Sequence, residues 1–135
     1  MTTNNEAIHT CEIPVRWDEM DSNGHVNNKI YQSYLDEARI QAMTKKGYDF
    51  PELRKSNIGP VITKIEIEYK NELKHPDTVI VESKLEFLNK FRACFHQKLI
   101  RKSDNLLVCN GKTFWFMMDL SRKRPIEVSY LPKSA

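Results

Sequence analysis

The sequence predicts an α+β fold in which an antiparallel sheet of about five strands wraps around one long central helix. Two observations lead to this prediction. The stretch 28–46 has the apolar spacing of an amphipathic helix, and later stretches alternate apolar and polar residues as strands joined by short turns do. The 135 residues suit one domain, residues 1–135, which is long enough to bury a core.

The first strand is expected near the N-terminus. Cys11, Ile13, Val15 and Trp17 alternate with polar residues, which is typical of a strand with one buried face. Pro14 has no N–H to donate to a neighbouring strand, so it indicates an edge or bulged position. We therefore expect an outer strand of the sheet.

The central helix is expected over residues 28–46, after a polar loop that contains glycine. Its apolar stripe has the spacing of one helix face and consists of Tyr31, Tyr34, Leu35, Ala38 and Ala42. The opposite face carries the polar residues Gln32, Ser33, Asp36, Arg39 and Lys46. Asn27 and Asn28 are suitable N-terminal caps, and Gly47 is a suitable residue just after the helix.

The remaining strands are expected from period-two alternation at 61–69, 79–87, 91–99 and 106–119. Gly111 is a candidate bulge in the last of them. Residues 114–118 are apolar on both faces, which predicts a strand covered on both sides. Residues 48–59 are expected to be a connector with turn residues and at most a short helical turn, and the tail 121–135 is expected to be peripheral.

Composition excludes several classes of function. The net charge of +3, from 21 basic and 18 acidic residues, gives no nucleic-acid footprint but is compatible with a phosphorylated ligand. Three cysteines in apolar surroundings favour reduced thiols. Residues 1–6 lack a secretory pattern, and no apolar run approaches the roughly 20 residues needed to span a membrane. We therefore expect a cytoplasmic protein with no membrane or nucleic-acid partner.

The loop before the helix carries residues suited to acyl transfer. Asp21, Asn23 and His25 supply a carboxylate, an amide and an imidazole beside a helix N-terminus, which offers free N–H groups and about half a positive charge. Two structural readings stay open, because Asp21 could cap a turn and His25 could be a structural hydrogen-bonding residue. No metal site is expected, because the other histidines lack partners at ligand spacing: His9, His75 and His96.

Two stretches resemble a known family. Asp21 to Arg39 reads D-S-N-G-H-V-N-N-x-x-Y-x-x-Y-L-D-E-A-R, and Tyr69 to Asp77 reads Y-x-x-x-L-x-x-x-D. With them the chain resembles the hotdog-fold acyl-CoA thioesterases of the 4-hydroxybenzoyl-CoA thioesterase family over most of its length. The D-x-N-x-H motif is also similar to that of plant-type acyl-carrier-protein thioesterases.

These resemblances imply roles for individual residues. In the first family the position of Asp21 holds the catalytic carboxylate, and the backbone N–H at the position of Asn28 polarises the thioester carbonyl. The second family implicates the positions of Asn23 and His25 in catalysis. Substrate contacts are expected from a further set: Gly24, Val26, Tyr31, Lys90 and Arg92. Lys90 belongs to a hairpin where the first family carries basic residues for the nucleotide phosphates.

The implied reaction is hydrolysis of an acyl thioester, carried by coenzyme A or by an acyl-carrier protein, to a free acid and a thiol. Asp21 would attack the carbonyl or activate water as a general base, and no cofactor is needed. Two alternatives stay open: a hotdog dehydratase, and a thioester-binding or scaffold protein without catalysis. A homodimer or homotetramer is expected, because one helix cannot cover both faces of the strand at 114–118.

Overall fold

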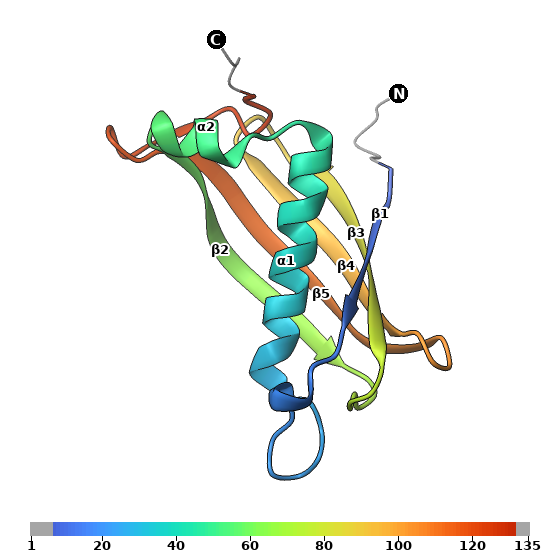
Figure 1. Ribbon diagram of the computed structural model, residues 1–135. Coiled ribbons are helices and arrows are strands. Elements are labelled where there is room, and N and C mark those ends of the chain that lie inside the picture. The colour runs from blue at the N-terminus through green and yellow to red at the C-terminus, as the bar shows by residue number, and fades with distance from the viewer. Residues whose placement is uncertain (1–6, 132–135) are drawn as a thin grey trace.

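The structure, a computed structural model, describes residues 7–131 and confirms the expected sheet and helix (Figure 1). The elements follow one another as β1 (His9–Pro14), the short turn η1 (Trp17–Glu19), α1 (Asn28–Lys46), α2 (Phe50–Lys55), β2 (Ile58–Tyr69), β3 (Thr78–Phe87), β4 (Arg92–Arg101), β5 (Leu106–Asp119) and β6 (Arg124–Ile126). Residues 1–6, where no secretory signal is expected, lie outside the described residues, and so do residues 132–135 of the tail.

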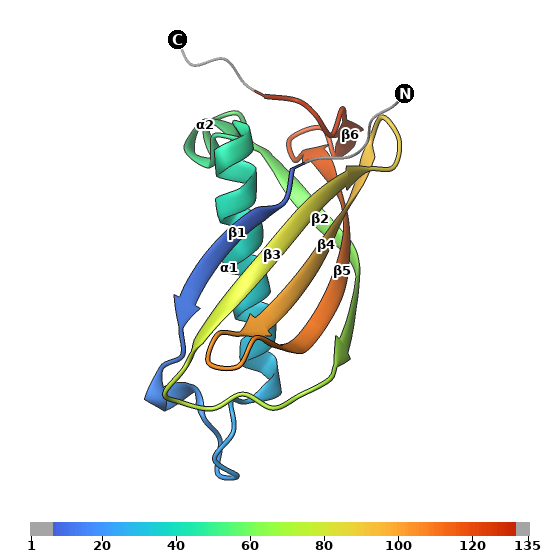
Figure 2. The same cartoon turned by 90° about the vertical axis from the view of Figure 1, so that its right-hand side faces the viewer.

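The strands form one antiparallel sheet in the order β1-β3-β4-β5-β2, with the short β6 paired to β5. Figure 2 shows the sheet curling along the length of α1. β1 lies at one edge, which confirms the edge position inferred from Pro14. β2 is the opposite edge, and its pairing with β5 joins it to the sheet.

Local signals fix both ends of α1. The Asn27 side chain accepts a hydrogen bond from the Lys29 N–H at 3.2 Å, so Asn27 is the N-cap and Asn28 is the first helical residue. Gly47 ends the helix with φ of 118°, a left-handed conformation that glycine adopts without strain. The helix lies against β1, β3 and β4.

Two segments are more regular in structure than the sequence indicates. Residues 50–55 form the helix α2 rather than a plain connector, because Asp49 caps it and Leu53, only 1% exposed, is buried in the core. The tail likewise contributes the strand β6. Both segments are too short for periodicity to reveal them, and contacts with distant parts of the chain stabilise them.

The predicted bulge at Gly111 is wrong. Gly111 pairs regularly with Gln97 on one side and Ile67 on the other, and the irregularities fall at Leu99/Ile100 and Ile62/Lys64. Glycine is needed here for space, because a Cβ at this position would lie 3.2 Å from the Glu66 carbonyl oxygen and 3.4 Å from Leu35 Cδ1. The backbone of β2 and the Leu35 side chain of α1 both lie close to this position, which explains why it is a glycine.

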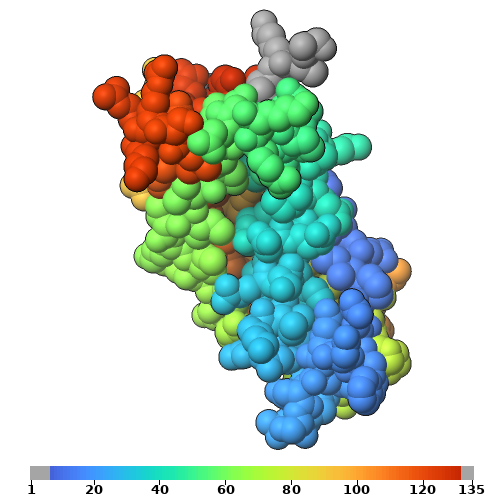
Figure 3. All heavy atoms as spheres, turned by 60° about the vertical axis from the view of Figure 1, so that its left-hand side comes forward, coloured from blue at the N-terminus to red at the C-terminus, as the bar shows by residue number. Residues whose placement is uncertain are grey.

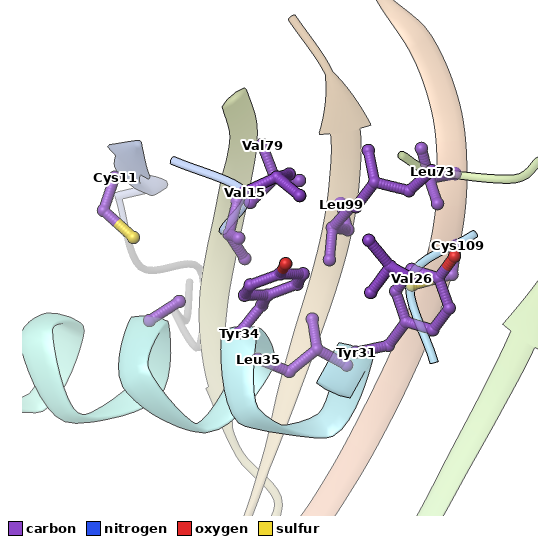
Figure 4. Packing of buried hydrophobic residues seen from close by; sticks show 13 residues of the cluster. Cys11, Val15, Val26, Tyr31, Tyr34, Leu35, Leu73, Val79, Leu99 and Cys109 are labelled. Carbon is purple, nitrogen blue, oxygen red and sulfur yellow. The ribbon is translucent and has the colours of Figure 1, made fainter. Parts of the chain in front are cut away.

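The core consists of two apolar clusters, one near each end of α1. Figure 4 shows the cluster at the helix start, where side chains from α1 meet those of the sheet and of two loops. Between the clusters lies a buried polar layer made of Arg39, Ser83, Gln97 and Thr113. The expectation that Arg39 belongs to the solvent face of the helix is therefore wrong, since the residue is only 7% exposed.

Candidate active site

Residues 21–26, here called the Asp21 loop, form a small hairpin that precedes α1. An isolated bridge between Met20 and Val26 closes it. The Asp21 N–H donates to the His25 carbonyl at 2.8 Å, and the Gly24 N–H donates to the Asp21 carbonyl at 3.0 Å. Gly24 has φ of 78°, which a residue with a side chain adopts only with strain. The tip of the loop is thus shaped by its own backbone.

The base of the loop is anchored in the protein. The Val26 N–H donates to the Leu73 carbonyl at 2.7 Å, and the Asn27 N–H donates to the Glu19 carbonyl at 3.0 Å. Val26 is only 4% exposed, and Figure 4 shows its side chain beside Tyr31 and Leu73. The expected substrate-contacting residue Val26 therefore has its side chain in the core and fixes where the loop joins the helix.

The start of α1 keeps one donor unused. The Asn27 side chain accepts the Lys29 N–H, and the Asn27 carbonyl accepts the Ile30 N–H at 2.9 Å. The Asn28 N–H has no acceptor among the described residues. Because unsatisfied N–H groups at a helix N-terminus bind negative charge, Asn28 offers a donor that could stabilise an anionic oxygen of a ligand.

The Asp21 carboxylate lies exposed on the same loop. One of its oxygens, Oδ1, accepts the Asn23 N–H at 2.9 Å, which fixes the direction of the side chain. Within the described residues, no cation forms an ion pair with Asp21. The carboxylate therefore has a second oxygen available for a water molecule or a substrate.

His25 has a partner that the sequence did not indicate. Its Nε2 contacts a carboxylate oxygen of Glu72, which lies in the loop between β2 and β3. The side chains are 40% and 66% exposed, respectively, so the contact lies at the surface. Glu72 falls within the Tyr69–Asp77 motif, but no spacing rule relates it to His25, because only the folded chain brings the two loops together.

A second carboxylate supports the segment before the loop. The Tyr34 hydroxyl donates to Glu19 Oε1 at 2.6 Å, and the same oxygen accepts the Arg16 N–H at 2.8 Å. Burial of Tyr34, together with its hydrogen bond to Glu19, raises the pKa of the phenol well above its usual range. Tyr34 therefore stays protonated and ties η1 to the helix.

Tyr31 lies between the helix and the edge strand. It is 5% exposed, and its ring centroid lies 5.4 Å from that of Tyr69 on β2 and 6.5 Å from that of Tyr34. Burial raises the pKa of Tyr31 to about 12, so the phenol is neutral. Tyr31 is therefore a core residue one turn into α1, and its expected contact with the substrate stays a prediction.

Lys90 and Arg92 belong to the turn between β3 and β4 and the start of β4. Figure 1 shows this hairpin at the opposite end of the sheet from the loop that precedes α1. Their hairpin follows the end of β3, whereas the Asp21 loop lies near its beginning, so the strand of 10 residues, roughly 33 Å at about 3.3 Å per residue, separates them. Lys90 pairs with Glu127 at 3.4 Å, and Arg92 has no ionic partner among the described residues. Within one chain, Lys90 and Arg92 therefore do not reach the Asp21 loop.

Other kinds of site find no support in residues 7–131. No group of three or more His, Cys, Asp or Glu in this range could hold a metal ion. Cys11, Cys94 and Cys109 are buried free thiols, as expected. No helix within the described range has the length and apolar character to cross a membrane.

The chain has sequence similarity to known thioesterases. The chain is 22% identical over 121 residues to the chloroplastic acyl-acyl carrier protein thioesterase ATL3 of Arabidopsis thaliana, covering 90% of this chain but only 63% of that relative. It is 25% identical over 115 residues to the long-chain acyl-CoA thioesterase FadM of Escherichia coli, covering 85% of this chain and 86% of FadM.

The fold is shared with solved structures. The DHNA-CoA thioesterase from Staphylococcus aureus superposes with a TM-score of 0.82 at 22% sequence identity, covering 89% of this chain and 80% of that chain. This likeness confirms the expected hotdog fold. Residues 15–132 match the family model of the Thioesterase-like superfamily, which is most of the chain. The chain therefore belongs to the Thioesterase-like superfamily.

Proposed function

We propose that the protein hydrolyses an acyl thioester, of coenzyme A or of an acyl-carrier protein, to a free acid and a thiol. The observation that carries the proposal is that the loop with the exposed carboxylate of Asp21 leads directly into a helix whose first N–H, that of Asn28, has no acceptor among the described residues. These are the two groups that thioester hydrolysis requires. The family to which the chain belongs supports the same reaction.

Asp21 would act in one of two ways. As a general base it takes a proton from water, and the hydroxide formed attacks the carbonyl carbon. As a nucleophile it forms an anhydride with the acyl group, which water then opens. In both routes the C–S bond breaks and the thiolate leaves without a strong acid, because a thiolate is a stable anion. The exposed second oxygen of the carboxylate suits either route.

The helix start would stabilise the transition state. When the carbonyl is attacked, its oxygen becomes an oxyanion, and the Asn28 N–H would donate to it. One such donor is typically worth about 3 kcal/mol in the transition state. Because the Asn27 side chain accepts the Lys29 N–H, the neighbouring Asn28 N–H would remain available to the substrate.

His25 and Glu72 would position rather than react. Contact with Glu72 orients the imidazole and favours a tautomer with a proton on Nε2, which leaves Nδ1 as an acceptor. Asn23, Gly24 and His25 would then shape the wall of the site around the thioester. This assignment follows from His25 contacting Glu72 instead of Asp21.

We further propose a homodimer formed through β2. This edge strand of 12 residues exposes apolar side chains, with Ile62 at 45%, Ile65 at 38% and Tyr69 at 48%. Long apolar edge strands are prone to pair with another chain, and a two-fold axis would pair them antiparallel. Light scattering should give twice the mass of one chain, and a stable monomer at micromolar concentration would refute the proposal.

The dimer would explain the separation of the two predicted sites. In an antiparallel pair of β2 strands, the Ile58 end of one chain lies beside the Tyr69 end of the other. Lys90 and Arg92 of one chain would then approach the Asp21 loop of the other and could meet the phosphates of coenzyme A. The buried free thiols are typical of a reducing compartment and support a cytoplasmic protein.

Asp21→Asn tests the proposed reaction. Release of free thiol from a panel of acyl-CoA substrates, followed with a thiol-reactive chromophore, should fall by about two to four orders of magnitude in turnover. Asp18→Asn is the matched control, because Asp18 is an exposed aspartate on η1. Equal turnover by wild type and Asp21→Asn would remove the carboxylate from the mechanism. Binding of acyl-CoA without any thiol release would favour the non-catalytic alternative.

A further inference from the structure

A second pocket lies between α1 and β1, at the C-terminal end of the helix. Figures 1 and 2 show that β1 begins at the same end of the sheet as the last turn of α1, and Figure 3 shows the other flank of the helix, which faces β2. The pocket has a volume of about 390 Å³, which is in the range of sites for small molecules. Its inner wall is apolar and is formed by Ala42 of α1, Leu85 of β3 and Phe95 of β4.

The pocket is far from the proposed active site. Lys45, which lines it, lies in the last turn of α1, whereas Asn28 is the first residue of the same helix. A rise of about 1.5 Å per residue separates the two positions by roughly 26 Å along the helix. A small ligand in the pocket would therefore not contact the Asp21 loop.

The solvent side of the pocket is basic. The exposed residues Lys45 and Lys46 line it from the helix, and His9 lines it from β1. None of the described residues that line the pocket is acidic. Lys45 forms no ion pair with any residue in the described range. A negatively charged group at the opening would therefore face positive charge that no carboxylate neutralises.

His9 adds a polar atom without a partner. Its side chain faces the helix, because His9 lies two residues before Cys11 on β1 and Cys11 belongs to the core. Its Nδ1 is buried and has no hydrogen-bond partner within residues 7–131. Such atoms are rare in folded proteins, because they lose water without gaining a partner. Rotation of the ring about the Cβ–Cγ bond would let Nδ1 bond to an oxygen atom of a ligand in the pocket.

We propose that this pocket binds a medium-chain fatty acid as its carboxylate, at a site separate from the proposed active site. The carboxylate lies at the opening, where Lys45 and His9 donate hydrogen bonds to it. The hydrocarbon chain lies against Ala42, Leu85 and Phe95, where it is removed from water. The proposal does not depend on thioester hydrolysis, because no residue of the Asp21 loop takes part.

The volume of the pocket limits the length of the chain. An apolar cavity of about 150 Å³ holds one benzene molecule. On that scale, about 390 Å³ has room for roughly 12 to 16 non-hydrogen atoms, which is the size of decanoate or dodecanoate. Affinity should therefore rise from butanoate to decanoate and increase little from dodecanoate to hexadecanoate, whose additional methylene groups stay in water.

Isothermal titration calorimetry with decanoate tests the proposal on wild type, Lys45→Glu and the matched control Lys55→Glu. Each of these lysines lies in the last turn of a helix, so both substitutions place an acid at a helix end. Lys45→Glu should weaken binding at least about fivefold, and Lys55→Glu should leave it unchanged. Decanol, which has the same chain without the charge, should also bind at least about fivefold more weakly. No binding to wild type, equal effects of the two substitutions, or equal binding of decanol would overturn the proposal.

Amide chemical shifts of isotope-labelled protein give the location of the ligand. Decanoate should shift the amide signals of His9, Ala42 and Leu85 and leave those of Gly24 and Asn28 in place. Shifts confined to Gly24 and Asn28 would put decanoate in the proposed active site and overturn the proposal. Ala42→Trp, which fills the pocket from the helix, should abolish the shift at His9. If decanoate shifts His9 but no thioester is hydrolysed, the proposed function fails and the fatty-acid site stands.

Discussion

Glu72→Gln separates a positioning role for Glu72 from a reacting one. The substitution keeps the size of the side chain and removes the charge that faces His25. The loop itself should not move, because backbone hydrogen bonds from Val26 to Leu73 and from Asn27 to Glu19 hold its base. Any change in turnover can then be ascribed to the imidazole.

The expected magnitude follows from exposure. Both side chains are more than a third exposed, at 40% for His25 and 66% for Glu72. Screening by water limits such a surface contact to about 1 kcal/mol or less, which corresponds to at most about fivefold in rate. A group that transfers protons in the reaction would instead cost about two to four orders of magnitude. Glu72→Gln should therefore lower kcat a few-fold.

Steady-state thiol release with wild type, Glu72→Gln, His25→Ala and the double variant provides the measurement. If Glu72 acts only through His25, the second substitution adds nothing in the His25→Ala background. Glu68→Gln, which removes an exposed carboxylate paired with Lys70 at 3.1 Å, is the matched control. A hundredfold loss in Glu72→Gln, or full additivity in the double variant, would refute the positioning role.

Three further outcomes are expected. Gly111→Ala should lower the free energy of unfolding by about 1 kcal/mol in urea titrations through crowding against Glu66, whereas Gly59→Ala, whose Cβ would lie 3.8 Å from Leu120, should be neutral or slightly stabilising. Burial raises the pKa of the Cys109 thiol from 9.0 to about 11, so the folded state keeps a proton that the unfolded chain loses. The contribution of this thiol to stability should be full below pH 9 and fall by up to about 1.4 kcal/mol per pH unit as pH rises to about 11. Cys109→Ala should make the measured loss of stability between these pH values shallower. The KM for acyl-CoA should rise with salt while kcat stays constant, because exposed charges are screened over about 8 Å at physiological ionic strength. Lys90→Glu should raise KM at low salt and make its rise with salt shallower, because an attraction to the phosphates is replaced by a repulsion that salt also screens. A KM insensitive to both salt and this substitution would favour a carrier-protein substrate.

The sequence predicted the elements with strong periodicity and missed those without it. The stripe from Tyr31 to Ala42 and the alternation of residues 79–87 each repeat often enough to exclude other conformations, and both elements formed as expected. α2 and β6 span 6 and 3 residues, so their local preferences are weak. Leu53, buried against the rest of the core, shows that tertiary contacts decide such segments.

Arg39 shows a different limit of pattern reading. On a helical wheel it lies at the border between the apolar stripe and the polar face, and an arginine there is ordinarily assigned to solvent. Its burial depends on Gln97 and Thr113, two polar residues that face inward from different strands. Gln97 and Thr113 each fit the alternation of their strands, so no local sequence pattern identifies them as partners of a buried arginine. The layer exists only when α1 meets the three strands β3, β4 and β5.

The same distinction divides the candidate site. Asp21, Asn23 and His25 are close in sequence to the helix start, so their shared location follows from the chain itself, and a motif can encode it. Glu72 reaches His25 because the neighbouring Leu73 carbonyl, in the loop between β2 and β3, accepts the Val26 N–H and joins the two loops. The residues proposed to react can thus be identified from one stretch of the sequence. The residues that orient them can come from any part of the chain that folding brings close to that stretch. A motif search limited to the loop would therefore find the proposed chemistry and miss its support.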